Sequence, residues 1–234
     1  MYSDAFCKVY NIFGWNYFPE AFGEQLLIWL ERNQVTVRTS MDLACGTGVL
    51  CEILQKSGIK ASGMDFSEGM IDIARENNPD IEYEVADMIT YRPEKRFDLV
   101  TCTGDALNHI IDLKNVEQIF QNVYGYLNEG GYFIFDILNE KEVASEEPFD
   151  LDFSDTVKAR FVVTQNQKGI INLKTTVFEN GVQQFEENIT ETVHDPEVIC
   201  DLLRKSGFEV LQCADQMLED AKAHGTTWFV IARK

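Results

Sequence analysis

Apolar residues between positions 35 and 138 fall into short runs, separated by stretches in which they recur every three or four residues. Short runs bounded by turn residues predict buried strands, and the longer spacing predicts helices with one buried face. The predicted strands are a run that ends at residue 44 and residues 59–64, 81–86, 97–102 and 132–138. Helices are expected to begin near residues 49, 68 and 116. This alternation predicts an α/β fold with a mostly parallel sheet and right-handed crossovers.

The N-terminal residues 1–36 depart from this rhythm because they are rich in aromatic side chains. Apolar residues at helical spacing between Pro19 and Arg32 predict a helix, with the proline in its first turn. The aromatic residues before it allow two interpretations: a helix packed on the core, or a lid over a bound ligand. Residues 1–36 are therefore assigned as an aromatic lid followed by a helix.

Residues 146–193 form a second departure, with strand-like runs and no helical spacing. The runs are 157–164, 170–178 and 184–192, and Asn180-Gly181 is typical of a hairpin turn. The acidic residues 145–152 predict a connector. A helix is expected to start at Asp195-Pro196, and residues 208–213 and 226–232 predict a closing pair of strands. The sequence thus predicts a core of residues 37–145 and 194–234, with an antiparallel sheet of about three strands inserted on its substrate side.

A glycine-rich turn follows the first predicted strand, in Met41-Asp42-Leu43-Ala44-Cys45-Gly46-Thr47-Gly48-Val49-Leu50. The small residues let the backbone approach a ligand closely, and the helix after them presents free N–H groups. A dinucleotide fingerprint requires a third glycine where this chain has Val49 or Cys51. A phosphate-binding P-loop requires a lysine, which this turn lacks. The loop therefore indicates a nucleotide ligand without a pyrophosphate.

Aspartates stand at the ends of the first three predicted strands, as Asp42, Asp65 and Asp87. Ligands of open α/β sheets bind beyond the carboxyl ends of the strands, so these carboxylates are expected near one site. A carboxylate at Asp65 can accept both hydroxyls of a ribose, and Asp87 can accept an adenine amine beside the backbone N–H of Met88. A single aspartate at such a position is usually a turn or cap residue. Three of them in step with a glycine loop favour a binding site.

Five segments together resemble the class I S-adenosylmethionine-dependent methyltransferases: Asp42 to Gly48, Gly63-Met64-Asp65-Phe66-Ser67, Ala86-Asp87-Met88, Phe97-Asp98 and Leu127 to Gly131. The resemblance implies a Rossmann-like fold with a seven-stranded, mostly parallel sheet flanked by helices. It also implies S-adenosylmethionine as cofactor and S-adenosylhomocysteine as product. The cofactor-binding residues it implies are Tyr10, Asp42, Ala44, Cys45, Gly46, Gly48, Asp65, Phe66, Asp87, Met88 and Thr103.

Among class I enzymes the chain looks like the small-molecule N-methyltransferases related to glycine N-methyltransferase and the sugar N,N-dimethyltransferases. Gly104-Asp105-Ala106-Leu107-Asn108-His109-Ile110 is similar to their Gly-Asn-Ser-Phe-Ala-His-Leu stretch, and Val9-Tyr10-Asn11 to an N-terminal Tyr-Asp pair. The chain departs from that pair at Asn11. The resemblance makes His109 the candidate catalytic residue, to accept a proton or orient the substrate, with a purely structural histidine as the alternative.

The charge of the chain narrows the possible substrates, because the formal net charge is −19. Such a field disfavours nucleic acid and anionic membranes as partners, and suits a small neutral or cationic molecule. The six cysteines are scattered without a C-x-x-C pair, so no metal site is expected. Neither a signal peptide nor a membrane span is apparent, which predicts a cytoplasmic protein. Oligomeric state is left open.

The sequence therefore predicts a methyltransferase that moves the sulfonium methyl in line onto a small molecule, at nitrogen in preference to oxygen. Two alternatives remain: an O-methyltransferase of a small molecule, and a non-catalytic module that binds S-adenosylmethionine or S-adenosylhomocysteine to regulate a partner. An oxidoreductase is disfavoured because Val49 interrupts the dinucleotide fingerprint.

Overall fold

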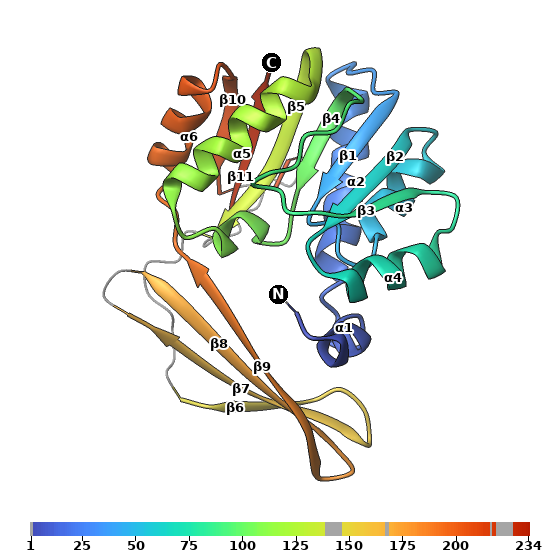
Figure 1. The fold of residues 1–234 in the computed structure, drawn as a ribbon, viewed down its shortest axis with the longest axis vertical. Helices are drawn as coiled ribbons and strands as arrows, with labels where there is room; N and C mark the ends of the chain where they lie inside the picture. Colours follow the sequence, from blue (N-terminus) through green and yellow to red (C-terminus); the bar gives the residue numbers. More distant parts are fainter. Residues whose placement is uncertain (1, 139–146, 167–168, 216, 219–226) are drawn as a thin grey trace.

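The computed structural model describes residues 2–138, 147–166, 169–215, 217–218 and 227–234. Its larger sheet has seven strands in the order β10-β11-β5-β4-β1-β2-β3 (Figure 1). Their bounds are β1 Thr39–Leu43, β2 Lys60–Asp65, β3 Glu82–Val85, β4 Phe97–Cys102, β5 Leu127–Leu138, β10 Glu209–Ala214 and β11 Thr227–Arg233. Neighbours from β5 to β3 pair in parallel, whereas β11 pairs antiparallel with both β5 and β10. The predicted Rossmann-like fold class is confirmed.

Helices cover both faces of this sheet. Their bounds are α1 Asp4–Tyr10, α2 Tyr17–Arg32, α3 Val49–Lys56, α4 Glu68–Asn77, α5 Leu113–Tyr126 and α6 Pro196–Lys205, with a short 3-10 helix, η1, at Ala106–His109. One apolar cluster joins α5 and α6 to the sheet, with Phe120 against Phe133 and Phe135. A second cluster joins α2 and α3 to the other face, around Phe22 and Phe229. The central strands are therefore buried on both faces, as continuous apolar runs predict.

Local capping agrees with the sequence at two helix starts. Ser67 Oγ accepts the Met70 N–H at the start of α4, and Asp195 Oδ1 accepts the Glu197 N–H before α6. These bonds satisfy backbone donors that the first helical turn leaves unpaired. At the other predicted boundaries the differences are small: α2 begins at Tyr17, and β5 begins at Leu127 with an irregular register before Tyr132.

The small sheet has four antiparallel strands in the order β6-β7-β8-β9, where the sequence predicted about three. They are β6 Phe149–Asp152, β7 Val157–Gln165, β8 Ile170–Glu179 and β9 Val182–Thr192. The prediction of a connector over 145–152 is wrong for β6. Its acidic residues Asp150 and Asp152 are exposed and pair with Arg160 and Lys158, so they form the outward half of an alternating strand.

Other features of the small sheet agree with the sequence. Asn180 and Gly181 have φ of 51° and 77°, which gives the hairpin turn expected between β8 and β9. The predicted domain boundary at residues 145 and 146 lies outside the described residues. Among the described helices, none has the length and apolar character of a membrane span.

The N-terminal helix α1 lies between α4 and the small sheet (Figure 1). An aromatic cluster fills this interface, in which Phe6 and Trp15 are 5.1 Å apart between ring centroids and Phe13 packs on Phe153 at 4.3 Å. Ser3 caps α1 by accepting the Phe6 N–H, and its hydroxyl donates to the carboxylate of Glu187 on β9. The aromatic N-terminus is thus attached to the small sheet.

Candidate active site

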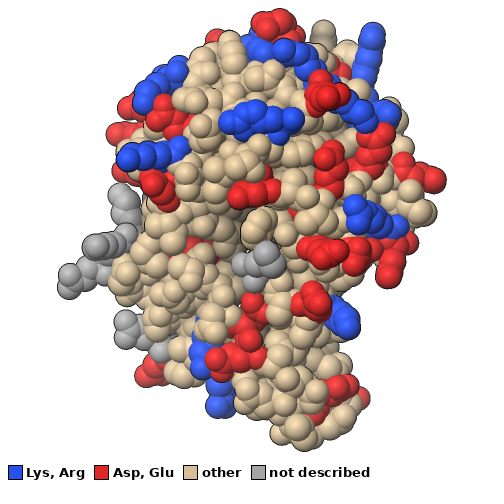
Figure 2. All heavy atoms as spheres, in the orientation of Figure 1, with Lys and Arg blue, Asp and Glu red and all other residues tan. Residues whose placement is uncertain are grey.

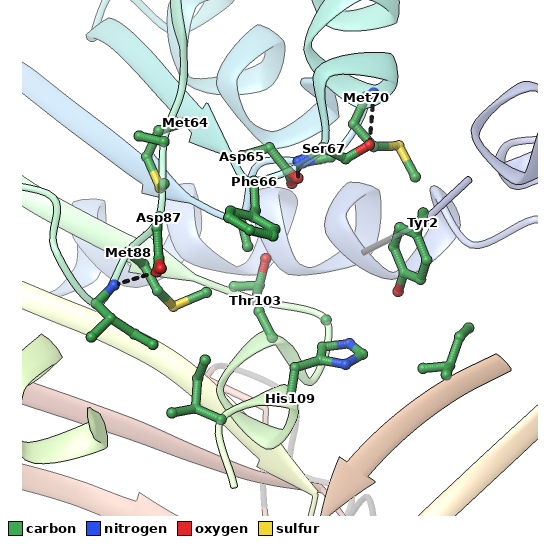
Figure 3. Close-up of a pocket in the computed structure, with 18 of the residues that line it drawn as sticks. Tyr2, Met64, Asp65, Phe66, Ser67, Met70, Asp87, Met88, Thr103 and His109 are labelled. Carbon is green, nitrogen blue, oxygen red and sulfur yellow. Dashed lines mark hydrogen bonds between the residues drawn. The ribbon is translucent and has the colours of Figure 1, made fainter. Parts of the chain in front are cut away.

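A cavity of about 420 Å³ lies where the carboxyl ends of β1, β2 and β4 face α1 and the small sheet. In Figure 3, Asp65 and Phe66 lie on one side of it and His109 on the opposite side. Tyr2 lies at one end, and Asp87 and Met88 lie at the other. The cavity therefore sits at the switch in strand order between β1 and β4, the expected ligand position for such sheets.

Nine of the residues proposed from the sequence line this cavity: Tyr10, Ala44, Gly46, Asp65, Phe66, Asp87, Met88, Thr103 and His109. They come from α1, from the ends of β1, β2 and β4, from the segment after β3 and from η1. Thr103 lies just after β4, between Phe66 and His109 in Figure 3. Segments far apart in the chain thus converge on one space.

The turn after β1 is shaped by residues with positive φ. Ala44 and Gly46 have φ of 54° and 53°, and both line the cavity. A Cβ built on Gly46 would meet no atom within 4 Å, because it would project into open space. Gly48 has φ of 83°, and a Cβ there would collide with the Tyr83 hydroxyl. Gly46 therefore leaves room for a ligand, whereas Gly48 serves the packing of α3.

Asp65 holds the turn to the start of α4. Its Oδ2 accepts the Gly46 N–H at 2.9 Å and its Oδ1 accepts the Ser67 N–H at 2.8 Å. Burial raises the pKa of Asp65, opposed by these backbone donors. Each carboxylate oxygen can accept more than one hydrogen bond, so the pair of oxygens can also receive two ligand hydroxyls.

The far end of the cavity suits a flat, uncharged ring. Phe66 lines it although its side chain is 52% exposed, and Met64 and Met88 add further apolar surface. Asp87 Oδ1 accepts the Ile89 N–H at 2.8 Å, which fixes the carboxylate at the end of β3. This combination of a hydrogen-bond acceptor and apolar surfaces fits the adenosine part of S-adenosylmethionine.

Three residues proposed from the sequence do not line the cavity: Asp42, Cys45 and Gly48. Asp42 is buried under the turn, where Thr101 Oγ1 donates to its carboxylate at 2.6 Å and burial raises its pKa to about 7. Cys45 Sγ is directed towards Cys51, and both sulfur atoms would crowd a Cβ on Gly63. In this structure these three residues pack against the protein interior and stabilise the turn, and they do not face the cavity.

His109 is held from the small sheet. Its Nδ1 lies 3.3 Å from the Thr190 carbonyl oxygen, and because a carbonyl only accepts, Nδ1 donates. The neutral ring then has an unprotonated Nε2, which lies 3.7 Å from Glu191 Oε1. Burial lowers the pKa of His109, so the imidazole is neutral at pH 7 and Nε2 can accept a proton.

Several cavity residues were not identified from the sequence, notably Tyr2 and residues Asn188, Ile189 and Thr190 of β9. Tyr2 belongs to the aromatic N-terminus, for which a lid over a ligand was one interpretation of the sequence, so the sequence did offer an indication of its position. Its ring meets His109 edge-on at 6.2 Å, and it lies near Tyr10, whose pKa burial raises to about 12. The β9 residues belong to none of the methyltransferase motifs. The sequence placed the inserted strands on the substrate side, but it did not indicate which of their residues line the cavity.

Residues 41–131 match the family model described as "Methyltransferase domain". A ubiquinone biosynthesis O-methyltransferase of Coxiella burnetii is 31% identical over 113 residues, which cover 45% of this chain and 47% of that relative. The chain thus matches about half the length of that curated relative.

Solved structures share the fold over nearly the whole chain. A S-adenosylmethionine-dependent methyltransferase from Clostridium acetobutylicum has a TM-score of 0.83 and 23% identity, and covers 92% of this chain and 91% of its own. The S-adenosylmethionine-bound CalS10 of Micromonospora echinaspora, described as an amino pentose methyltransferase, has a TM-score of 0.77 and 16% identity, covering 100% and 98%. With the family match at residues 41–131, the chain carries a methyltransferase domain, and its fold is that of S-adenosylmethionine-dependent methyltransferases of known structure.

Proposed function

We propose that this protein transfers a methyl group from S-adenosylmethionine to a nitrogen atom of a small molecule. One observation carries the proposal: a single cavity is lined both by the strand-end residues of the methyltransferase domain and by His109 and β9. The acceptor would enter between the domain and the small sheet, close to His109. The bound cofactor supplies a sulfonium methyl, and the protein supplies alignment, desolvation and a proton acceptor.

We assign each part of the bound cofactor to particular residues of the chain. Asp65 receives the ribose hydroxyls, Phe66 and Met88 flank the base, and Asp87 receives its amine. The backbone at Gly46 leaves space for the amino-acid tail. Tyr2 and Tyr10 close the cavity from the N-terminal side and exclude water from the reacting atoms.

Charge supports nitrogen as the acceptor atom. Of the described residues that line the cavity, none is a lysine or an arginine, whereas Asp65 and Asp87 are acidic. Acidic side chains are also spread over the face of the molecule drawn in Figure 2, in keeping with the net charge of −19. Such a field attracts an ammonium ion, the common form of an aliphatic amine at neutral pH. The amino pentose methyltransferase among the structural neighbours adds support.

Calorimetry with S-adenosylmethionine, S-adenosylhomocysteine and NAD tests cofactor binding. Wild type is expected to bind the two sulfur nucleotides and not NAD. Asp65→Ala removes charge-assisted hydrogen bonds, so its affinity is expected to fall by about 2–4 kcal/mol. Asp72→Ala is a matched control, because Asp72 is exposed on α4 and pairs with Arg75. Absence of sulfur-nucleotide binding in wild type would overturn the proposed function.

Turnover separates the enzyme from a non-catalytic binding module. A panel of amines, alcohols and phenols is incubated with S-adenosylmethionine, and methylated products are identified by mass spectrometry. We expect N-methylated products, and a large loss of rate in His109→Ala with unchanged S-adenosylhomocysteine binding. If only alcohols or phenols were methylated, the acceptor atom would be oxygen and the proposal of a nitrogen acceptor would be wrong. Tight cofactor binding without any product would favour the regulatory module.

A further inference from the structure

Glu191 places a carboxyl group on the inward face of the small sheet. On the same face of β9, the buried carboxyl group of Glu187 accepts hydrogen bonds from Ser3. Phe185 and Ile189 have the same parity along β9 and pack in the aromatic cluster under α1. The Glu191 side chain is only 20% exposed. Burying a carboxyl group is costly unless a partner compensates for the lost water. The position therefore demands an explanation.

A second hydrogen-bond acceptor lies close to this carboxyl group. Glu191 Oε1 lies 3.7 Å from His109 Nε2, which is unprotonated because Nδ1 donates to Thr190. An ionised carboxylate and an unprotonated imidazole nitrogen can only accept, so they cannot bond to each other. A donor with at least two N–H groups, placed against both atoms, would satisfy them together.

Asp105 adds a second buried carboxyl group. Its side chain shares a hydrogen bond with the carboxyl group of Asp136, and its backbone has φ of 57°, a conformation that a non-glycine residue rarely adopts. The neighbouring Asp136 fixes this turn by accepting the Gly104 N–H at 2.8 Å and the Asp105 N–H at 3.0 Å. The turn thus holds a second carboxyl group close to Glu191.

The charges around Glu191 favour a cation. Burial and the negative charge of Asp105 raise the pKa of Glu191 to about 7. Among the described residues, the titratable groups that face it are His109, Asp105 and the Tyr2 hydroxyl, and none of these three is cationic at neutral pH. A bound positive charge would relieve the repulsion between the two carboxyl groups.

The two segments that carry His109 and Glu191 are held in register by one buried side chain. Asn108 Nδ2 donates to the carbonyl oxygens of Leu138 at 2.9 Å and Thr192 at 2.7 Å, and its Oδ1 accepts the Leu138 N–H. Asn108 precedes His109, and Thr192 follows Glu191. The spacing between His109 and Glu191 is therefore fixed by the fold before any ligand arrives.

We propose that Glu191 and His109, with Asp105 behind them, receive the ammonium group of the acceptor. Glu191 then determines specificity: the substrate class is a basic primary or secondary amine. This inference rests on the proposed function and deepens it. Glu191 holds the ammonium by charge, and one N–H proton passes to His109 Nε2. The freed lone pair forms the new N–C bond while the S–C bond breaks and leaves its electron pair on sulfur. The proton on His109 then leaves to solvent.

Matched amine and alcohol probes test this inference without requiring turnover. Cyclohexylamine and cyclohexanol, and benzylamine and benzyl alcohol, are titrated into the S-adenosylhomocysteine complex and followed by NMR, including the ring nitrogens of His109. Wild type is expected to bind each amine roughly 10- to 100-fold more tightly than its alcohol at about pH 8. The preference is expected to fall below about pH 6, as Glu191 is protonated.

Substitutions at one strand separate charge from structure. Glu191→Gln keeps the size of the side chain and is expected to lose most of the amine preference and its pH dependence, and Glu191→Asp to restore part of both. Glu186→Gln is the matched control, because Glu186 is exposed on β9 and pairs with Lys174. Binding of S-adenosylhomocysteine is expected to change less than about threefold in all three variants.

Equal binding of amines and alcohols to the wild-type complex would overturn the inference and leave the cofactor site intact. Identical behaviour of Glu191→Gln and Glu186→Gln would do the same. Failure of S-adenosylhomocysteine to bind wild type would instead overturn the proposed function on which the inference rests.

Discussion

The two sheets of this protein differ in how much of each is buried. Strands β1, β4 and β5 of the larger sheet are covered on both faces, and Leu43, Leu99 and Phe135 are fully inaccessible. The small sheet is covered on one face only, by α1 and its aromatic cluster, and every residue of β6 is exposed. The proposed cofactor site lies at the strand ends of the first sheet, and the proposed acceptor site lies between His109 and the second sheet. The candidate site residues of the larger sheet lie in sequence motifs and could be predicted from them. In the small sheet, the sequence predicts the strands from the alternation of residues, but it does not identify site residues.

The largest expected effect tests this difference in burial. Phe120→Ala removes a fully buried ring that contacts Phe133 and Phe135, and is expected to lower the free energy of unfolding by about 3–5 kcal/mol. Phe149→Ala on β6 is the matched change in the small sheet. Because Phe149 is 45% exposed, its loss is expected to cost less than about 1.5 kcal/mol. Urea unfolding measures both, and equal costs would contradict the comparison.

A pH series sharpens the comparison through Asp42, the buried carboxyl group of β1. Its pKa in the folded protein is about 7, above the ordinary value of 3.8, so the folded state favours the protonated form. The stability from this group is complete below about pH 4 and is lost as the pH rises through 7. Asp42→Asn removes this pH dependence of the free energy of unfolding. The loss of stability in Asp42→Asn relative to wild type is therefore expected to decrease by at most about 4 kcal/mol between pH 4 and 8.

Urea midpoints measured across this pH range check the prediction. Asp155→Asn in the loop between β6 and β7 is the control, because Asp155 is exposed. A parallel pH dependence in wild type and Asp42→Asn would show that Asp42 is ionised in the folded state.

The smallest effect concerns the contact between the small sheet and α1. Ser3→Ala removes both the helix cap and the hydroxyl that donates to Glu187, a residue only 7% exposed. The loss is expected to be about 1 kcal/mol and local to α1. Hydrogen exchange of the α1 amides is expected to accelerate severalfold, with the α6 amides as an internal control. Acceleration throughout the larger sheet would mean that α1 is part of the global folding unit.

Much of the larger sheet could be predicted because the apolar pattern, the helix caps and the turn residues all indicate the same helices and strands. Apolar runs mark its strands, Ser67 and Asp195 mark helix starts, and glycine marks the turn after β1. The limits have physical reasons. Strand β6 was predicted as a connector because its outward residues are acidic. Glu191 could be placed on a strand, but its approach to His109 depends on how the small sheet docks. That docking is a tertiary property.

The hydrogen bonds of Asn108 also bear on how such enzymes diversify. One amide joins the last residue of β5 to the last residue of β9, so the inserted sheet is secured at both ends by a single side chain of the methyltransferase domain. A foreign sheet grafted between these two points, with its end bonded to Asn108 in the same way, would meet His109 in the same register. Exchange of the inserted strands would therefore change the residues that face His109, and it would leave the strand ends of the larger sheet in place.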